Sequence, residues 1–145
     1  MRLRVHSAEV QTLKTSGRPW DGFWVRVPKE ELAGFFALSV REQLERLVAG
    51  GDAPNPPDVM VRLKVGGKVV LKTPAEESFD PVWAEDGPSV ELSPGTELYI
   101  EVYDLDFIWH DFMGSTTLKV PERPTDGLWS LEPFGQVRKL VFRLD

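Results

Sequence analysis

Three aspartates stand close together where the sequence pattern indicates the end of a strand and the loop after it. Asp104 and Asp106 directly follow an alternating stretch, residues 97–103, and Asp111 comes five residues after Asp106. Side chains two positions apart at a strand end point the same way, so the carboxylates of Asp104 and Asp106 are expected to face one side. The spacing predicts a group of carboxylates at one end of a domain, suited to binding a cation.

Two more aspartates precede another predicted strand. Asp58 opens the alternating stretch 58–65, and Asp52 lies six residues before it. If the two loops share one end of the domain, five carboxylates converge there, and their repulsion is costly unless a cation lies between them. Oxygen ligands without His or Cys favour Ca²⁺, which takes roughly six to eight oxygens in loose geometry, over Mg²⁺. Taken singly, each aspartate is also compatible with a solvated carboxylate or a turn cap.

Alternation of apolar and polar residues predicts that most of the chain is β-structure. The alternation of the first strand slips near Ser7, which indicates a bulge or an accidental irregularity. Gly66 and Gly67 separate two strands, which is typical of a tight hairpin. About eight strands with turn signals between them indicate a sandwich or a barrel. The predicted strands are residues 2–13, 58–65, 68–72, 89–92, 97–103, 113–120, 128–131 and 137–144.

Residues 29–48 have the apolar spacing of a helix, begin after a proline and end before two glycines. Most of their apolar residues fall in one arc, with charged residues opposite. Phe35 and Leu38 fall on the polar side, so we expect them either to touch a neighbouring loop or to form an exposed contact surface. The arc consists of Leu32, Ala33, Phe36, Val40, Leu44, Leu47 and Val48.

Composition limits the class of protein. The 145 residues fit one domain and include no cysteine, which excludes disulfides, thiolate metal sites and cysteine nucleophiles. The net charge of −6, without a run of Lys and Arg, argues against nucleic acid as a partner. No stretch approaches the roughly 18 apolar residues of a transmembrane helix, and residues 1–10 lack the apolar core of a secretory signal. Any membrane contact is therefore expected to be peripheral.

Two segments resemble the C2 domain family, as in protein kinase C and synaptotagmin. Residues 99–114 are similar to the third loop of that family, which has an apolar strand, Asp-x-Asp, a short loop and then Asp-Phe-(Met/Leu)-Gly. Residues 59–73 and 80–85 resemble the basic hairpin and the Asn-Pro-x-Trp-Asn-Glu motif of the family, with Asp80 where Asn is usual. The resemblance implies an all-β, eight-stranded antiparallel Greek-key sandwich.

The same resemblance implies one domain over residues 1–145, with residues 17–57 as a long insertion in the first loop that contains the helix. It implies that Asp58, Asp104, Asp106 and Asp111 are calcium ligands. The insertion makes the first-loop ligand a choice between two aspartates. Asp52 has the six-residue spacing of the family, whereas Asp21 follows the first strand at about the usual distance. The prediction favours Asp52.

The implied function is calcium-dependent binding to anionic phospholipid membranes through the loops at one end of the sandwich. An acidic cluster repels an anionic membrane when it is empty and attracts one when it holds divalent ions. The apolar tip of the third loop is predicted to insert into the membrane, or else to pack on the inserted helix. This tip is Phe107, Ile108 and Trp109. Aromatic residues of the first loop are predicted either to insert into the membrane as well or to cover the helix. They are Trp20, Phe23 and Trp24.

Four basic residues lie in the hairpin over residues 62–72. In many C2 domains the corresponding hairpin binds anionic lipid, and a solvated edge surface is the other interpretation. Each basic residue near an anionic surface would contribute roughly 1 kcal/mol. The residues are Arg62, Lys64, Lys68 and Lys72.

The alternative function is a calcium-independent protein–protein interaction module that uses the same fold and a partner surface on the inserted helix. An enzyme is not predicted, because His110 beside Asp111 lacks a nucleophile at a fixed spacing and the chain has no phosphate-binding glycine loop. The expected location is the cytoplasm, with peripheral association to membranes.

Overall fold

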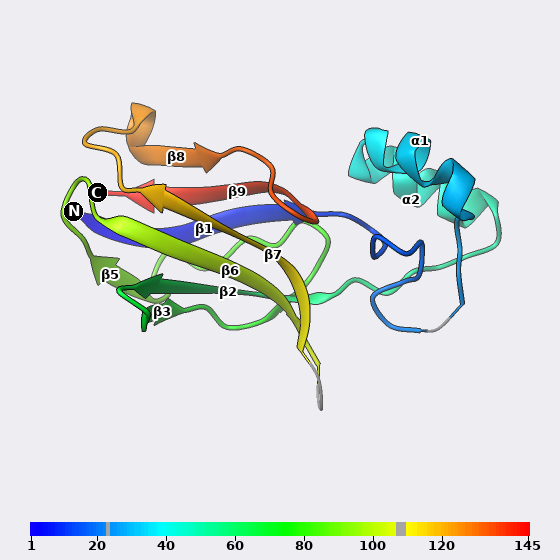
Figure 1. The fold of residues 1–145 in the computed structure, drawn as a ribbon, viewed down its shortest axis with the longest axis horizontal. Coiled ribbons are helices and arrows are strands. Elements are labelled where there is room, and N and C mark those ends of the chain that lie inside the picture. The colour runs from blue at the N-terminus through cyan, green and yellow to red at the C-terminus, as the bar shows by residue number, and fades with distance from the viewer. Residues whose placement is uncertain (23, 107–109) are drawn as a thin grey trace.

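The computed structural model describes residues 1–22, 24–106 and 110–145, and its strands form two antiparallel sheets (Figure 1). One sheet has the strand order β5-β1-β9-β8, where β1 is Arg2–Val10, β5 is Ser89–Glu91, β8 is Leu128–Leu131 and β9 is Val137–Leu144. The other has the order β3-β2-β6-β7, where β2 is Asp58–Val65, β3 is Lys68–Lys72, β6 is Glu97–Leu105 and β7 is His110–Lys119. A short strand, β4 (Glu76–Glu77), pairs with β2.

Alternation along the strands builds the core between the sheets, as a period of two requires. Within β2 and β6 alternate residues are buried, and they meet the buried residues of β1 and β9 in one hydrophobic cluster. The predicted Greek-key sandwich is confirmed, with β4 as an additional strand beyond the eight predicted. The members of the cluster from these four strands include Val59, Val61, Leu63, Leu98, Ile100, Val102, Leu3, Val5, Leu140 and Phe142.

Two local predictions from the sequence are also confirmed. The pairing of β1 with β9 shifts register between Val5 and Ser7, which is the predicted bulge. Gly66 and Gly67 both have positive φ, at 58° and 78°, which the tight turn between β2 and β3 requires.

The segment over residues 17–57, predicted to be an insertion and called the insertion below, contains two helices where the sequence predicted one over residues 29–48. A 3-10 turn, η1 (Lys29–Glu31), leads into α1 (Leu32–Ala37), and a second helix, α2, covers Val40–Ala49. The break has a local cause: Ser39 caps α2 by accepting a hydrogen bond from the Glu42 N–H, and the Glu42 side chain accepts one from the Ser39 N–H.

The structure favours the first of the two alternatives predicted for Phe35 and Leu38, contact with a neighbouring loop. Phe35 is fully buried, in a small apolar cluster of the insertion with Leu13, Val27 and Leu47, and Leu38 packs against that cluster. One continuous helix over residues 29–48 would place both residues on its polar side. The residues between α1 and α2 are not helical, so the two helices do not share one apolar face.

Hydrogen bonds of one buried polar side chain, Gln43, fix the insertion to the sandwich. Gln43 of α2 is fully buried, and its side-chain oxygen accepts hydrogen bonds from the N–H and the hydroxyl of Thr12, at 3.2 and 2.8 Å. Its amide donates to Gln11 Oε1 at 2.7 Å and to the Leu38 carbonyl at 3.2 Å. Arg138 of β9 also donates to the Leu38 carbonyl. The insertion is therefore held in a defined position beside the end of β1.

Candidate metal site

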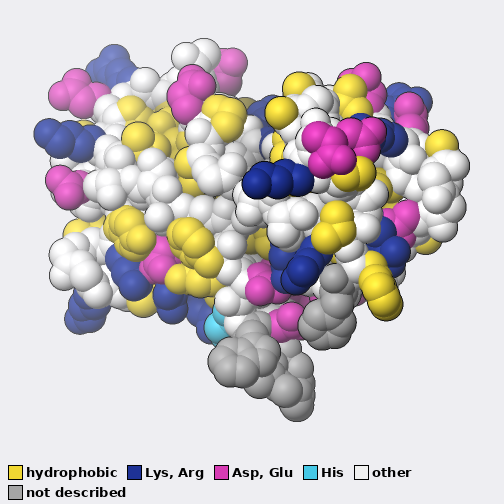
Figure 2. Space-filling model, turned by 45° about the vertical axis from the view of Figure 1, so that its right-hand side comes forward, with side chains coloured by type: hydrophobic (Ala, Val, Ile, Leu, Met, Phe, Trp, Pro, Cys, Tyr) yellow, Lys and Arg dark blue, Asp and Glu magenta, His cyan; other side chains and the backbone are white. Residues whose placement is uncertain are grey.

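Three carboxylates meet where β6 ends. Asp21, Asp104 and Asp106 each present an oxygen, and these atoms lie within 4.8 Å of one another. Asp104 is the next-to-last residue of β6, Asp106 follows that strand, and Asp21 comes from the insertion after β1. Figure 2 shows acidic side chains gathered at the lower edge of the molecule, with Lys and Arg side chains near them.

Asp104 is the buried member of this group, with 1% of its surface exposed. The N–H of Asp58 donates to its Oδ1 at 2.9 Å, whereas its Oδ2 has no hydrogen-bond partner among the described residues. Burial raises the pKa of Asp104 to about 7; the Asp58 N–H opposes this rise, and the charges of neighbouring aspartates add to it. An unsatisfied buried carboxylate oxygen is costly, because it has lost water without gaining another partner.

Asp58 and Asp111 lie around the three. Asp111 pairs with Asp104 across the β6–β7 ladder, and Asp58 opens β2 beside them. Burial raises the pKa of Asp21, and the negative charges of Asp106, Asp58 and Asp111 raise it further, against the opposing charge of Lys14. The described structure thus brings four of the five sequence-predicted aspartates into one electrostatically coupled region.

Asp52 is the exception, and the sequence preference for it over Asp21 does not match the geometry. Its Oδ2 lies 3.2 Å from Nε of Arg26, a distance that allows an ion pair although the atoms are not aligned for a hydrogen bond. The position close to Asp104 and Asp106 is taken by Asp21. Residues 17–57 fold back on themselves, so distance along the chain from β2 does not determine which aspartate of the insertion reaches β6.

Lys14 is a component of the site that the sequence did not reveal. Its Nζ lies 3.0 Å from Oδ2 of Asp111. An ammonium group here neutralises part of the acidic cluster, since at this distance it forms a direct ion pair. No local motif marks Lys14, because it follows β1 and is about 100 positions from Asp111.

The apolar residues that the sequence predicts to accompany the site fall into three groups. Phe107, Ile108 and Trp109, the predicted membrane-inserting tip, and Phe23 lie outside the described residues. Trp20 is buried and donates its Nε1–H to the Gln11 carbonyl at 2.9 Å, so it belongs to the core. Trp24 is 75% exposed and stands three residues after Asp21.

The basic hairpin is less available to anions than the sequence suggested. The N–H groups of Arg62 donate to both oxygens of buried Glu101, at 3.3 and 3.2 Å, and Lys64 Nζ lies 2.9 Å from the same carboxylate. Burial tends to raise the pKa of Glu101, but hydrogen bonds from Tyr103, Lys64 and Arg62 lower it to about 2. Lys68 and Lys72 are exposed.

Comparison with known proteins gives the family. The C2 domain model matches residues 30–132, so this chain belongs to the C2 domain family. It is 32% identical over 99 residues to human "Multiple C2 and transmembrane domain-containing protein 1", and 31% identical over 99 residues to the rat protein of that name. Each alignment covers 64% of this chain and 10% of the relative, so the chain spans about a tenth of those proteins.

A solved structure, "Structure of a C2 domain", has the same fold. Its TM-score is 0.52 at 14% identity, and the match covers 98% of this chain and 94% of the other. The C2 family is a family of binding modules. Within the described part of the chain, no helix has the length and apolar character needed to cross a bilayer.

Proposed function

We propose that this chain binds Ca²⁺ between its insertion and the β6–β7 end of the sandwich, and that it docks on anionic phospholipid membranes when Ca²⁺ is bound. The observation that carries the proposal is Oδ2 of Asp104, a buried carboxylate oxygen without a hydrogen-bond partner among the described residues, beside Asp21 and Asp106. This donor set fits Ca²⁺, because it consists of hard oxygens.

The ligands we assign are Asp21, Asp58, Asp104, Asp106 and Asp111. Ca²⁺ would supply positive charge and open coordination positions for phosphate oxygens of a lipid headgroup. The residues themselves keep the site selective for a cation, since the clustered carboxylates repel anions until their charge is compensated.

Apolar and basic residues would complete the membrane contact. Trp24 is exposed near Asp21, and an indole ring suits the boundary between headgroups and acyl chains. Membrane insertion by Phe107, Ile108 and Trp109 stays a proposal from the sequence. Of the predicted anionic-lipid patch, Lys68 and Lys72 are the members that we expect to contact lipid, because Glu101 engages Arg62 and Lys64. The corresponding location would be the cytoplasmic surface of a membrane.

Calorimetric titration of Ca²⁺ into chelator-treated protein tests the metal site. The wild type should bind Ca²⁺, and Asp104→Asn/Asp106→Asn should not; Asp86→Asn/Asp126→Asn, at exposed aspartates, is the matched control. Liposome sedimentation with and without Ca²⁺ then tests docking, and Trp24→Ala should weaken sedimentation without changing the calorimetry. No heat at about 1 mM Ca²⁺ from a folded wild type would exclude the calcium-dependent function.

A second candidate function is calcium-independent protein binding with the same fold. The observation that favours it is the ion pair between Lys14 and Asp111, because an internal ammonium group meets part of the need for a cation. If this function is correct, Lys14→Met should destabilise the calcium-free protein, and Ca²⁺ should not restore the stability. Under the first proposal, Ca²⁺ should restore it.

A further inference from the structure

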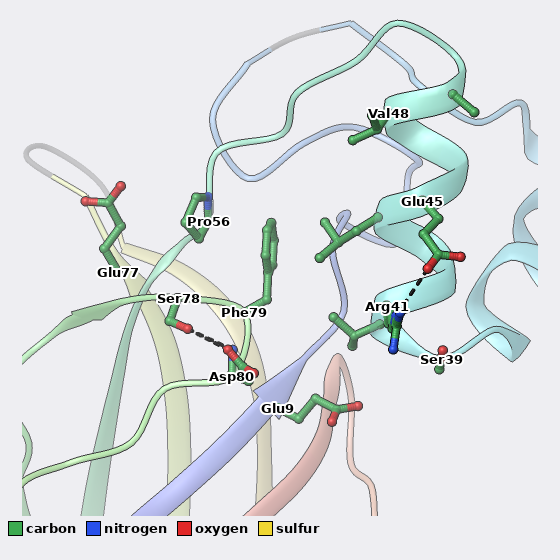
Figure 3. A pocket seen from close by; sticks show the side chains of 13 residues that line it. Glu9, Ser39, Arg41, Glu45, Val48, Pro56, Glu77, Ser78, Phe79 and Asp80 are labelled. Atoms are coloured by element: carbon green, nitrogen blue, oxygen red, sulfur yellow. Dashed lines mark hydrogen bonds and ion pairs between the residues drawn. The ribbon is translucent and has the colours of Figure 1, made fainter.

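A separate hollow lies between α2 and the adjoining loops of the sandwich. It has a volume of about 910 Å³, at the upper end of the range of roughly 300–1,000 Å³ that is usual for ligand sites. Val40, Leu44 and Val48 line it from α2, and Pro56 and Phe79 line it from the opposite side (Figure 3). We call this hollow, defined by these five apolar residues, the α2 groove.

The α2 wall of the groove is an ordered apolar stripe. Val40, Leu44 and Val48 are spaced four residues apart, so their side chains follow one another along one face of the helix. Val40 and Leu44 also pack against the sandwich core, whereas Val48 is 64% exposed. The stripe is about 12 Å long, from the helical rise of eight residues, which is enough for about two turns of a helix. Buried Gln43, next to Leu44 in the helix, fixes α2 to the end of β1, so the groove exists before any partner binds.

The rim of the groove is acidic. Among its described lining residues, Arg41 is the single cation, and it pairs with Glu45 at 3.2 Å. Glu9 pairs with Arg138 at 3.3 Å, whereas Glu77 and Asp80 have no ion-pair partner among the described residues. The lining carboxylates are Glu9, Glu45, Glu77 and Asp80.

We propose that the α2 groove binds a helical segment of a partner protein that carries apolar side chains on one face and Lys or Arg on its flanks. The apolar stripe and Phe79 would receive the apolar face, as in helix-in-groove recognition. The carboxylates of the rim complement basic flanks and disfavour anionic lipid in the same place. This inference uses residues outside the aspartate cluster and does not depend on Ca²⁺.

Fluorescence anisotropy with synthetic peptides tests the groove. The probe is a labelled amphipathic peptide of Leu and Lys, about four helical turns long, and its control has the same Leu positions with Glu replacing Lys. Titrations are made in chelator, which separates this surface from the calcium site. We expect saturable binding of the Lys peptide with Kd on the order of 10–100 μM and at least about tenfold weaker binding of the Glu peptide.

Two variants locate the binding site. Val48→Glu places a charge on the apolar stripe and should weaken binding of the Lys peptide by at least about tenfold, whereas Val69→Glu, at an exposed valine of β3, should not. Asp80→Lys reverses a rim charge and should weaken binding about threefold to fivefold, whereas Glu122→Lys, at an exposed site elsewhere, should have less effect. Val48→Glu should keep the calcium and liposome binding of the wild type. Failure of the groove proposal can therefore be distinguished from failure of the calcium proposal.

Three outcomes would overturn the inference. One is no binding of the Lys peptide up to about 1 mM by folded protein. Another is equal binding of the Lys and Glu peptides, or equal binding by wild type and Val48→Glu. The third is binding of laurate or of neutral phosphatidylcholine vesicles that is lost in Val48→Glu while no peptide binds, which would make the groove a lipid site.

Discussion

The N–H of Asp58 donates a hydrogen bond of 2.9 Å to Oδ1 of Asp104, and this contact fixes one carboxylate oxygen of β6 to the start of β2. It follows from the register of the two strands, in which Val59 stands opposite Asp104. Asp104 is therefore held in place on one side while its Oδ2 stays without a hydrogen-bond partner among the described residues. A carboxylate held in this way is preorganised to bind a cation.

Asp104→Asn should make the stability of the metal-free protein less dependent on pH. Burial, with the charges of Asp21, Asp106 and Asp111, raises the pKa of Asp104 from 3.8 to about 7. This pKa is higher in the folded than in the unfolded state. The contribution of protonated Asp104 to the stability of the folded protein is therefore complete below about pH 4 and is lost as pH rises through about 7. The rise corresponds to at most about 4 kcal/mol of unfolding free energy.

Urea unfolding in chelator, at several pH values between about 5 and 8, measures this effect. The stability of Asp104→Asn relative to the wild type should increase with pH, whereas Asp86→Asn, at an exposed aspartate, should follow the wild type. A difference between Asp104→Asn and the wild type that stays constant across this range would contradict the assigned pKa.

Lys14→Met should increase calcium affinity about fivefold to tenfold if the proposed metal site is correct. Lys14 Nζ lies 3.0 Å from Oδ2 of Asp111, so the ammonium group competes with a cation for that oxygen and repels the cation. Calorimetry gives the affinity directly, and Lys139→Met, at an exposed lysine of β9, is the control. Unchanged or weaker calcium binding by Lys14→Met would contradict the competition between Lys14 and Ca²⁺ for Asp111.

The strands and the acidic strand end could be predicted because both depend on local spacing. Alternation in β2 and β6 identifies the buried faces, and Asp104, Asp106 and Asp111 lie within eight positions of one another. The helix break was also encoded locally, by the capping pair Ser39 and Glu42. The helical periodicity outweighed that signal in the prediction.

The choice between Asp21 and Asp52 could not be made from sequence spacing. It depends on how the insertion folds, and this is set by distant contacts such as the ion pair of Asp52 with Arg26 and the burial of Phe35. Glu101 was missed for a similar reason. Its role follows from its position opposite Arg62 in the sheet, which requires the register of β2 against β6.

Glu101→Gln should destabilise the fold by about 2 kcal/mol and increase calcium-independent binding to anionic vesicles. The substitution keeps the shape of the side chain but removes the charge that Arg62 and Lys64 contact. It frees both cations for lipid phosphates. Urea unfolding and vesicle sedimentation in chelator measure the two effects, with Glu97→Gln, at an exposed site on the same strand, as control.

The pH dependence of Glu101 has the opposite sign to that of Asp104. Its pKa is lowered to about 2, so its stabilising contribution is present above about pH 4.5 and is lost as pH falls towards 2. The stability difference between the wild type and Glu101→Gln should therefore shrink over this acidic range. Unchanged vesicle binding by Glu101→Gln would indicate that Arg62 and Lys64 do not contact lipid even when Glu101 no longer engages them.

Gln43→Met should destabilise the protein by about 2–3 kcal/mol, although the two side chains have similar volumes. The buried N–H and hydroxyl of Thr12 lose their acceptor, and the Leu38 carbonyl loses one of its donors. Because these bonds join α2 to the end of β1, the insertion should also become more susceptible to limited proteolysis than the sandwich.

Urea unfolding compares this variant with Arg41→Met, which changes an exposed residue of the same helix and removes only its surface ion pair with Glu45. The control should cost no more than about 0.5 kcal/mol. Gln43→Met should also weaken binding of the basic peptide, because the α2 groove loses the anchor of one wall. Full stability of Gln43→Met, with unchanged proteolysis, would mean that apolar packing alone holds the insertion on the sandwich.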